Sequence, residues 1–207
     1  MRHLVYFIAL IGLAGCSLPG AREQAIRYFV LETPTPVAAA PLNPARPVLL
    51  LRDAETGVFA QSLRLIYSRT PGTQAYYQYA FWTDSPPKRL QTLLRQRLLT
   101  SGLYAGVVPL GAGVQGDYQL NFHLIDFYHD ATSTPGSARV RLEAELVERG
   151  SARLIAQQTF VAQAPLPSQD AAAAAAGLGL ASSEVMEAMV AWLVRVQPNS
   201  VVAAQAR

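Results

Sequence analysis

Residues 117–162 carry the pattern that most restricts the fold of this chain. Apolar and polar side chains alternate there in three consecutive runs, and a tight turn around Gly150 separates the second run from the third. Successive side chains of a strand point to opposite faces, so each run predicts a strand with one buried and one solvated face. We therefore predict an antiparallel meander. Its apolar positions are Tyr118, Leu120, Phe122, Leu124, then Ala138, Val140, Leu142, Ala144, Leu146, then Leu154, Ala156, Phe160 and Ala162.

The first run changes phase after Ile125. Asn121 and His123 are on its polar side before that point, whereas Asp126 and Tyr128 oppose the apolar side after it. A β-bulge, or a change in the layer that covers the strand, would produce this change of phase. We expect one or the other near Ile125.

Four earlier segments also predict strands: 28–31 (YFVL), 48–51 (VLLL), 63–68 (LRLIYS) and 76–82 (YYQYAFW). The run VLLL is apolar throughout, which is typical of a buried strand. In YYQYAFW, strict alternation puts one set of side chains on one face and the remainder on the other. The first set is Tyr77, Tyr79 and Phe81; the second is Tyr76, Gln78, Ala80 and Trp82.

Two further segments predict helices. Pro86 and Pro87 follow a cap at Asp84 or Ser85, and Gly102 marks the end of this helix. A second helix is expected from a cap at Ser168 to Pro198, weakened by Gly177 and Gly179. The apolar stripe of the first helix is Leu90, Leu93, Leu94 and Leu98, and that of the second is Ala181, Val185, Met189, Trp192 and Val196. The basic residues of the first helix are expected on a solvated face; they are Lys88, Arg89, Arg95 and Arg97.

These elements together predict an α+β fold. It has a mainly antiparallel sheet of about six or seven strands, with two main helices packed on one face. The chain has 207 residues, of which 51% are hydrophobic and 15% charged, so it can build a real core. Its arginines are scattered rather than clustered, and we expect no nucleic-acid partner.

The N-terminal segment MRHLVYFIALIGLAGC has the basic start and the apolar length of a signal peptide, and it is too short to cross a bilayer. Its last residues, Leu13-Ala14-Gly15-Cys16, resemble the lipobox of bacterial lipoproteins. That resemblance implies cleavage before Cys16 and attachment of lipid, such as palmitate, to its thiol. Cys16 is the only cysteine, so no internal disulfide can form. Ordinary secretion with cleavage near Ala14 is the alternative.

We therefore divide the chain into a removed signal peptide (1–15), a lipidated tether (16–27), one α+β domain (28–197) and a flexible C-terminal tail (198–207). Twelve steps separate Cys16 from Tyr28, a reach of at most about 40 Å, which keeps the domain near its membrane. Residue 17 is Ser rather than Asp. By resemblance to enterobacterial sorting, this implies anchoring at the periplasmic face of the outer membrane.

The sequence predicts no catalytic residue, no cofactor and no metal site, because catalytic motifs are missing from it. His123 and His129 would share a strand face about 20 Å apart, too far for one metal ion unless the bulge folds the strand. We interpret His129, Asp130 and Asp126 as a polar cluster at a hairpin end. Glu143 and Glu145 share a strand face with Arg139 and Arg141, and we expect cross-strand charge pairing there rather than acid–base chemistry.

The aromatic segment 76–82 has two interpretations. It is either a half-buried strand of high β-propensity or an adhesive surface for a partner or for lipid. For the second interpretation the candidate residues are Tyr77, Tyr79 and Trp82. The helix at 181–196 is expected to belong to the core, with a groove for acyl chains as the alternative.

The order of these features resembles the PqiC-like family of ABC-type transport auxiliary lipoproteins. The resemblance rests on Cys16, the YFVL strand, RPVLLLRDAETGVFAQSLRLIYSR, YQYAFWTDSPPKRLQTLLRQRL, DYQLNFHLIDFYHD and the C-terminal helix. One departure is Phe81, where the family often has Arg before Trp. The resemblance implies partners: an MCE-domain periplasmic protein, an ABC permease and an ATPase that move phospholipid between the membranes. It implies a docking role for the lipoprotein and allows a homo-oligomeric ring.

Two alternatives stay open. An LptE-like lipoprotein, which assists an outer-membrane β-barrel, also joins a lipidated cysteine to a small α/β domain. A periplasmic lipoprotein enzyme is disfavoured by the missing catalytic motifs.

Overall fold

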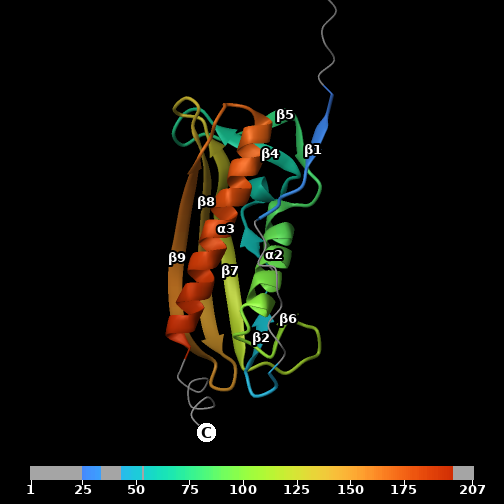
Figure 1. The fold of residues 1–207 in the computed structure, drawn as a ribbon, viewed down its shortest axis with the longest axis vertical. Helices are drawn as coiled ribbons and strands as arrows, with labels where there is room; N and C mark the ends of the chain where they lie inside the picture. The colour runs from blue at the N-terminus through green and yellow to red at the C-terminus, as the bar shows by residue number, and fades with distance from the viewer. Residues whose placement is uncertain (1–24, 34–42, 53, 198–207) are drawn as a thin grey trace, which may run out of the picture.

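The computed structural model describes residues 25–33, 43–52 and 54–197, and its longest strands form the predicted meander (Figure 1). Strand β7 (Tyr118–Asp130) pairs antiparallel with β8 (Ser137–Glu148), and β8 pairs antiparallel with β9 (Arg153–Pro165). The signal peptide, Cys16, most of the tether and the tail from residue 198 lie outside the described residues.

The expected bulge is confirmed. The register between β7 and β8 shifts between Leu124 and Asp126. Leu120, Phe122 and Leu124 are buried before the shift, and Phe127 and His129 are buried after it. Ile125 is the extra residue and is 39% exposed. Without the bulge, strict alternation from Leu124 would place Phe127 and His129 on the outer face of the sheet.

Short strands occupy the other edge of β7. In order along it lie β2 (Val48–Leu51), β3 (Glu55–Thr56) and β4 (Arg64–Ser68), all parallel to β7. Beyond them, β6 (Gly106–Pro109) pairs parallel with β2, β5 (Ala75–Trp82) pairs antiparallel with β4, and β1 (Arg27–Phe29) pairs parallel with β5. A short 3₁₀ helix, η1 (Val58–Gln61), connects β3 to β4.

The α+β class is therefore confirmed, and the sheet is mixed, with nine strands among the described residues. The three long strands are antiparallel, whereas the short strands meet β7 in parallel. Two strands, β3 and β6, have no counterpart in the sequence analysis. They contain two and four residues, too few to show an alternating pattern.

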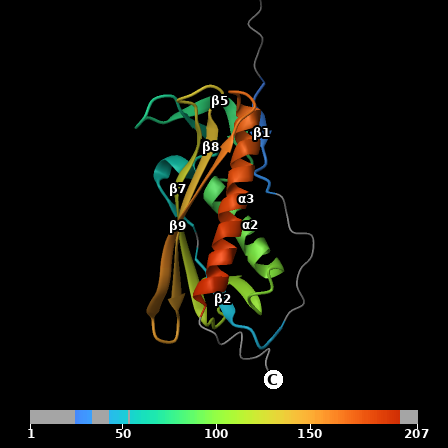
Figure 2. The same ribbon diagram turned by 60° about the vertical axis from the view of Figure 1, so that its left-hand side comes forward.

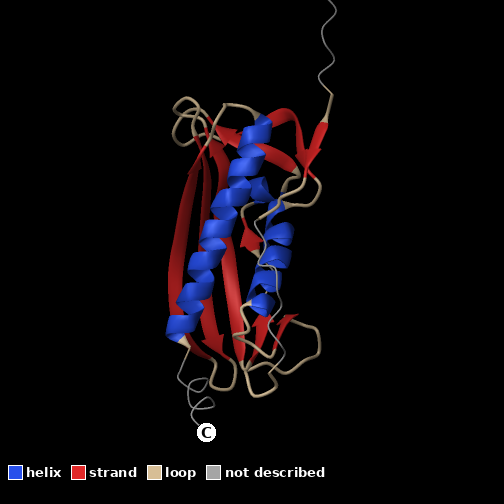
Figure 3. Ribbon diagram, viewed as in Figure 1, coloured by secondary structure: helices blue, strands red, loops and turns tan. Residues whose placement is uncertain are grey.

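Both long helices cover the same face of the sheet, as the side view shows (Figure 2; Figure 3 distinguishes helices from strands). They are α2 (Pro86–Thr100) and α3 (Ala171–Val196). The predicted apolar stripes face the sheet, and Trp192 of α3 packs edge-on against Phe160 of β9, with ring centroids 5.7 Å apart. By length and composition α3 could cross a bilayer, but 61% of its most apolar window is buried inside the protein, as in a core helix.

The helix caps differ in part from the prediction. Ser85 is the N-cap of α2, without a side-chain cap bond, and Gly102 follows the helix with φ +68°. The cap of α3 is Asp170, not Ser168. The Asp170 carboxylate accepts from the backbone amides of Ala172 (2.8 Å) and Ala173 (3.0 Å), while the Ser168 hydroxyl donates to the same carboxylate (2.6 Å).

The expectation that the basic residues of α2 form a solvated face is wrong for Arg97, whereas Lys88 and Arg95 are exposed and Arg89 is partly buried. The Arg97 guanidinium is buried and donates to the carbonyl and hydroxyl of Ser183 on α3 (3.1 and 2.9 Å) and to Glu187 (2.9 Å). Arg89 donates to the Leu31 carbonyl (2.9 Å), and Arg95 donates to the Val107 carbonyl (2.8 Å). The long aliphatic part of an arginine side chain lets its guanidinium extend beyond the apolar stripe, and these hydrogen bonds connect α2 to the segments packed beside it.

Residues 31–33 follow β1 and run between the two helices. The Leu31 side chain is buried, and its carbonyl accepts from Arg89 of α2. The next carbonyl, that of Glu32, lies against Gly179 of α3, where an added Cβ would be 2.3 Å from the oxygen. Gly179 therefore permits a close approach of two backbones, and this contact gives it a structural role besides its low helix propensity.

Gly179→Ala is expected to lower the free energy of unfolding by about 1–3 kcal/mol, although alanine is the better helix former. The obstructing atom is a backbone oxygen, which cannot rotate away. Gly177→Ala is the matched comparison. Its Cβ would meet the movable Leu166 side chain at 2.3 Å and the Ala138 Cβ only at 3.0 Å, so it should cost less. Urea unfolding measures both variants. A Gly179→Ala protein more stable than wild type would contradict the close approach.

Candidate functional site: a tyrosine-lined pocket

Strand β5 carries the aromatic residues, and it does not alternate as expected. Its register with β4 shifts between Arg64 and Ile66. The Arg64 guanidinium lies over the rings of both Tyr76 (5.7 Å) and Phe81 (5.5 Å), so these two residues share a face. Tyr77 instead packs toward the core, where Ala80 also lies. The assignment of Tyr76 and Phe81 to opposite faces was therefore wrong, because the strand is irregular between them.

The three residues of the predicted partner surface have different environments. Tyr79 is 37% exposed and Tyr77 is half-buried. Trp82 is only 1% exposed and packs against Phe127, with ring centroids 5.8 Å apart. Trp82 is a core residue and is removed from the predicted surface, because its indole has no face left for a partner.

Tyr77 and Tyr79 instead line a pocket of about 580 Å³. Its lining residues come from β1, β4, β5 and the start of α3. These elements lie in the upper part of Figure 1. Four tyrosines form much of its wall. The polar and aromatic lining residues are Arg27, Tyr67, Arg69, Tyr76, Tyr77, Gln78, Tyr79, Gln169 and Asp170. No pattern in the sequence groups Arg27, Tyr67, Arg69 and Asp170, because they come from three segments far apart in the chain: β1, the end of β4 and the cap of α3.

Both positively and negatively charged side chains line this pocket. Arg27 and Arg69 are exposed, and within the described ranges neither lies within 4.0 Å of a carboxylate oxygen. Arg69 lies over the Tyr67 ring, 5.1 Å from its centroid. The hydrogen bond from Ser168 and those from the Ala173 and Ala172 amides, together with the positive charge of Arg27, lower the pKa of Asp170, which therefore stays ionised. The pocket thus holds two positive charges and one negative charge that are not directly paired.

A buried histidine supports the pocket wall. His129 is fully buried; its Nδ1 lies 2.7 Å from the Tyr77 hydroxyl, and its Nε2 lies 3.2 Å from the Pro135 carbonyl. A carbonyl can only accept, so Nε2 carries the hydrogen and Nδ1 accepts from Tyr77. Burial lowers the pKa of His129 and raises that of Tyr77 to about 12. Both groups are therefore neutral at pH 7, and they fix the orientation of the tyrosine.

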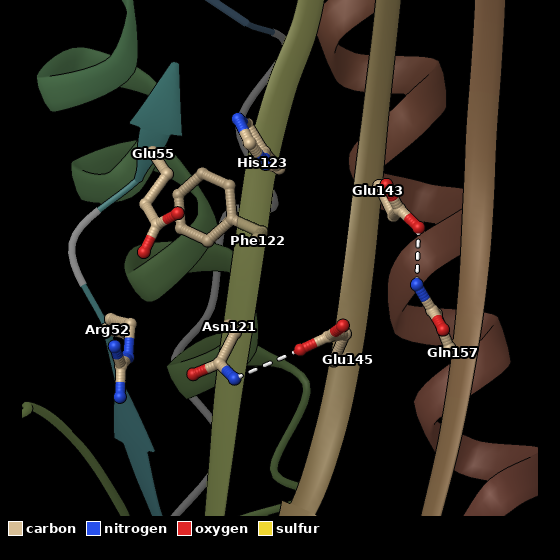
Figure 4. A pocket seen from close by; sticks show the side chains of 8 residues that line it. All are labelled: Arg52, Glu55, Asn121, Phe122, His123, Glu143, Glu145 and Gln157. Atoms are coloured by element: carbon tan, nitrogen blue, oxygen red, sulfur yellow. Dashed lines mark hydrogen bonds between the residues drawn. The ribbon is translucent and has the colours of Figure 1, made fainter. Parts of the chain in front are cut away.

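The other polar residues singled out in the sequence are on the open face of the sheet. A smaller pocket there, of about 290 Å³, is lined by Arg52, Glu55, Asn121, Phe122, His123, Glu143, Glu145 and Gln157 (Figure 4). Asn121 donates to Glu145 (3.3 Å), and Gln157 donates to Glu143. These contacts use β7, β8 and β9 together.

The cross-strand charge pairing expected on this face is found for Arg139 and Arg141 but not for Glu143 and Glu145, whose partners in the described part of the chain are amides. Arg139 donates to Asp126 at 3.1 Å, and Arg141 forms an ion pair with the same oxygen at 3.0 Å. The bulge is the reason, because it brings Asp126 opposite Arg141 on the open face.

The same bulge separates the two histidines of the domain. His123 is exposed on the open face, whereas His129 is buried on the helix side, so His129 and Asp126 do not form a common hairpin-end cluster. Within the described part of the chain, no three His, Cys, Asp or Glu side chains are grouped to hold a metal ion.

We expect the stability of the protein to fall as the pH drops from 7 toward 5. His129 has a lowered pKa in the folded state, so the unfolded state binds more protons below its ordinary value of about 6.5. His129→Gln should lose this part of the pH dependence. His123→Gln, at an exposed position, should retain it. Thermal unfolding at several pH values measures the slopes; equal slopes for wild type and His129→Gln would contradict the assignment.

Two solved structures resemble the described fold over most of its length. Protein XCC0632 from Xanthomonas campestris is 26% identical, with a TM-score of 0.72, and the match covers 82% of this chain and 96% of that one. An uncharacterized protein of 13% identity has a TM-score of 0.65, covering 82% and 99%. No curated protein sequence matches the chain.

A family model described as "ABC-type transport auxiliary lipoprotein component" matches residues 29–190. The match includes β5, the pocket tyrosines, α2, the entire meander and α3 as far as residue 190. The resemblance inferred from the sequence is thereby confirmed. This is a family of transport auxiliaries and not of enzymes. The chain belongs to the ABC-type transport auxiliary lipoprotein family.

Proposed function

We propose that this protein is the membrane-anchored docking component of an MCE/ABC-type system that moves phospholipid between the inner and outer membranes. The observation that carries the proposal is the family match over residues 29–190. Its partners would be an MCE-domain periplasmic protein, an ABC permease and an ATPase. The role is mechanical, to hold and align the periplasmic part of the system, and a homo-oligomeric ring is one way to do this.

The anchor in this proposal is Cys16. A lipobox-like sequence ends at this residue, and membership in a lipoprotein family supports its use. One acyl chain binds a membrane only weakly, with an association constant on the order of 10⁴ M⁻¹, so a multiply acylated cysteine would be needed for stable anchoring. Ser17 favours the periplasmic face of the outer membrane. The tether from Cys16 to Tyr28 would then keep the domain within about 40 Å of that surface.

Cys16→Ser is expected to leave an unprocessed precursor that incorporates no labelled palmitate, because the serine hydroxyl cannot form the thioether. Ser17→Ala should be processed and labelled like the wild type. Gel mobility and acyl labelling in cells measure both effects. Normal labelling of Cys16→Ser protein would contradict the lipoprotein assignment.

Native protein solubilised in mild detergent is expected to co-purify with an MCE-domain protein, a permease and an ATPase. Mass spectrometry of the eluate identifies the partners, and another outer-membrane lipoprotein carrying the same tag serves as the control. Recovery of an outer-membrane β-barrel without the transporter would favour the LptE-like alternative and would contradict the proposed system.

A further inference from the structure

We propose that the tyrosine-lined pocket binds the headgroup of a zwitterionic phospholipid that carries a primary amine, of the phosphoethanolamine type. The inference deepens the proposed function and rests on it for the presence of a bilayer beside the domain. The pocket volume of about 580 Å³ falls within the range of small-ligand sites. A headgroup fits such a volume while its acyl chains remain outside.

The phosphate of the headgroup would be held by Arg27 and Arg69. Neither guanidinium is used in an ion pair by the described part of the chain, although both line the same pocket. Arginine binds phosphate oxygens with a planar fork of N–H donors, and these charge-assisted bonds are strong. The Tyr67 ring beneath Arg69 limits the positions of that guanidinium.

The amine of the headgroup would be held by Asp170 and the tyrosine rings. The carboxylate is the one acidic group of the pocket lining, and it lies on the α3 side of the pocket. Asp170 and Arg27 line the same pocket, and the charge of Arg27 helps to lower the pKa of Asp170, but the two side chains form no ion pair within 4.0 Å. Both charges therefore remain available to a ligand. An ammonium group donates hydrogen bonds to a carboxylate and is attracted to aromatic faces. A purely anionic headgroup would also bind the two arginines, but the Asp170 carboxylate would repel its negative charge.

The position of the pocket favours a membrane lipid over a soluble phosphate. Ala25 lines the pocket and is nine residues from Cys16, a reach of at most about 30 Å. The adjacent strand also exposes an apolar row: Ile26 (56%), Tyr28 (66%) and Val30 (49%). These residues alternate with Arg27, so the same segment offers apolar surface on one side and a cation on the other. Amphipathic tyrosines are common at membrane–water boundaries.

Native mass spectrometry of the full-length acylated protein in detergent tests this inference. The probes are phosphatidylethanolamine and phosphatidylglycerol with identical acyl chains, added at equal concentration. We expect wild-type protein to bind phosphatidylethanolamine preferentially. Arg27→Gln combined with Arg69→Gln should weaken binding of both lipids about tenfold. Asp170→Asn should remove the preference for the amine while keeping a good helix cap.

Arg153→Gln is the control, because this exposed arginine is on β9 and outside the pocket, and it should bind lipid like the wild type. Circular dichroism verifies that each variant is folded. Glycerophosphoethanolamine should compete with the lipid, and inorganic phosphate should compete much less.

Four outcomes would overturn the proposal. They are equal binding of the two lipids by wild type, unchanged binding in the double arginine variant, a retained preference in Asp170→Asn, and equal competition by inorganic phosphate. The last would indicate a simple anion site. A protein that captures the transporter but no lipid would overturn this inference alone. A protein that binds the amine lipid but captures no transporter would overturn only the proposed function.

Discussion

The rest of the structure depends on the way β7 pairs along both of its edges. One edge is taken by β8 over its whole length, and the other supports three short parallel strands in succession. The bulge at Ile125 then decides which side chains after it face the helices. The bulge turns His129 inward, where it meets Tyr77, and Asp126 outward, where it meets Arg139 and Arg141. The pocket wall and the charged open face are thus two consequences of one irregularity.

The position of α3 depends in turn on two close contacts and one buried cation. Gly179 lets the backbone after β1 touch the helix, and Gly177 leaves room for Leu166. Arg97 connects the helix to α2 through Ser183. Leaving that guanidinium buried without its acceptors would be costly, so the connection constrains the angle of the two helices. Because α3 begins at Asp170, the same contacts that fix the helix also fix the negative charge in the pocket.

Elements with a long regular pattern could be predicted from the sequence. The three meander strands, the phase change near Ile125 and both apolar helix stripes follow from periodicity alone. The short strands β3 and β6 could not be found, because their stability comes from pairing with neighbours rather than from their own residues. Burial of Arg97 escaped prediction because a long side chain can reach a partner that its helical position does not reveal. Of the pocket, the sequence indicated Tyr77 and Tyr79, wrongly added Trp82, and missed the charged residues, which only the tertiary fold brings together.

Anchoring near β1 would give the two ends of the domain different surroundings. The pocket lies at the end where the described chain begins, whereas β2, β6 and the last turn of α3 lie at the opposite end (Figure 1). Helix α3 has 26 residues and therefore separates these ends by about 39 Å. A domain held by a tether of limited reach would keep the first end beside the bilayer and direct the second toward the periplasm. A lipid headgroup and a protein partner could then occupy the protein together, because each would contact a different end of one rigid helix.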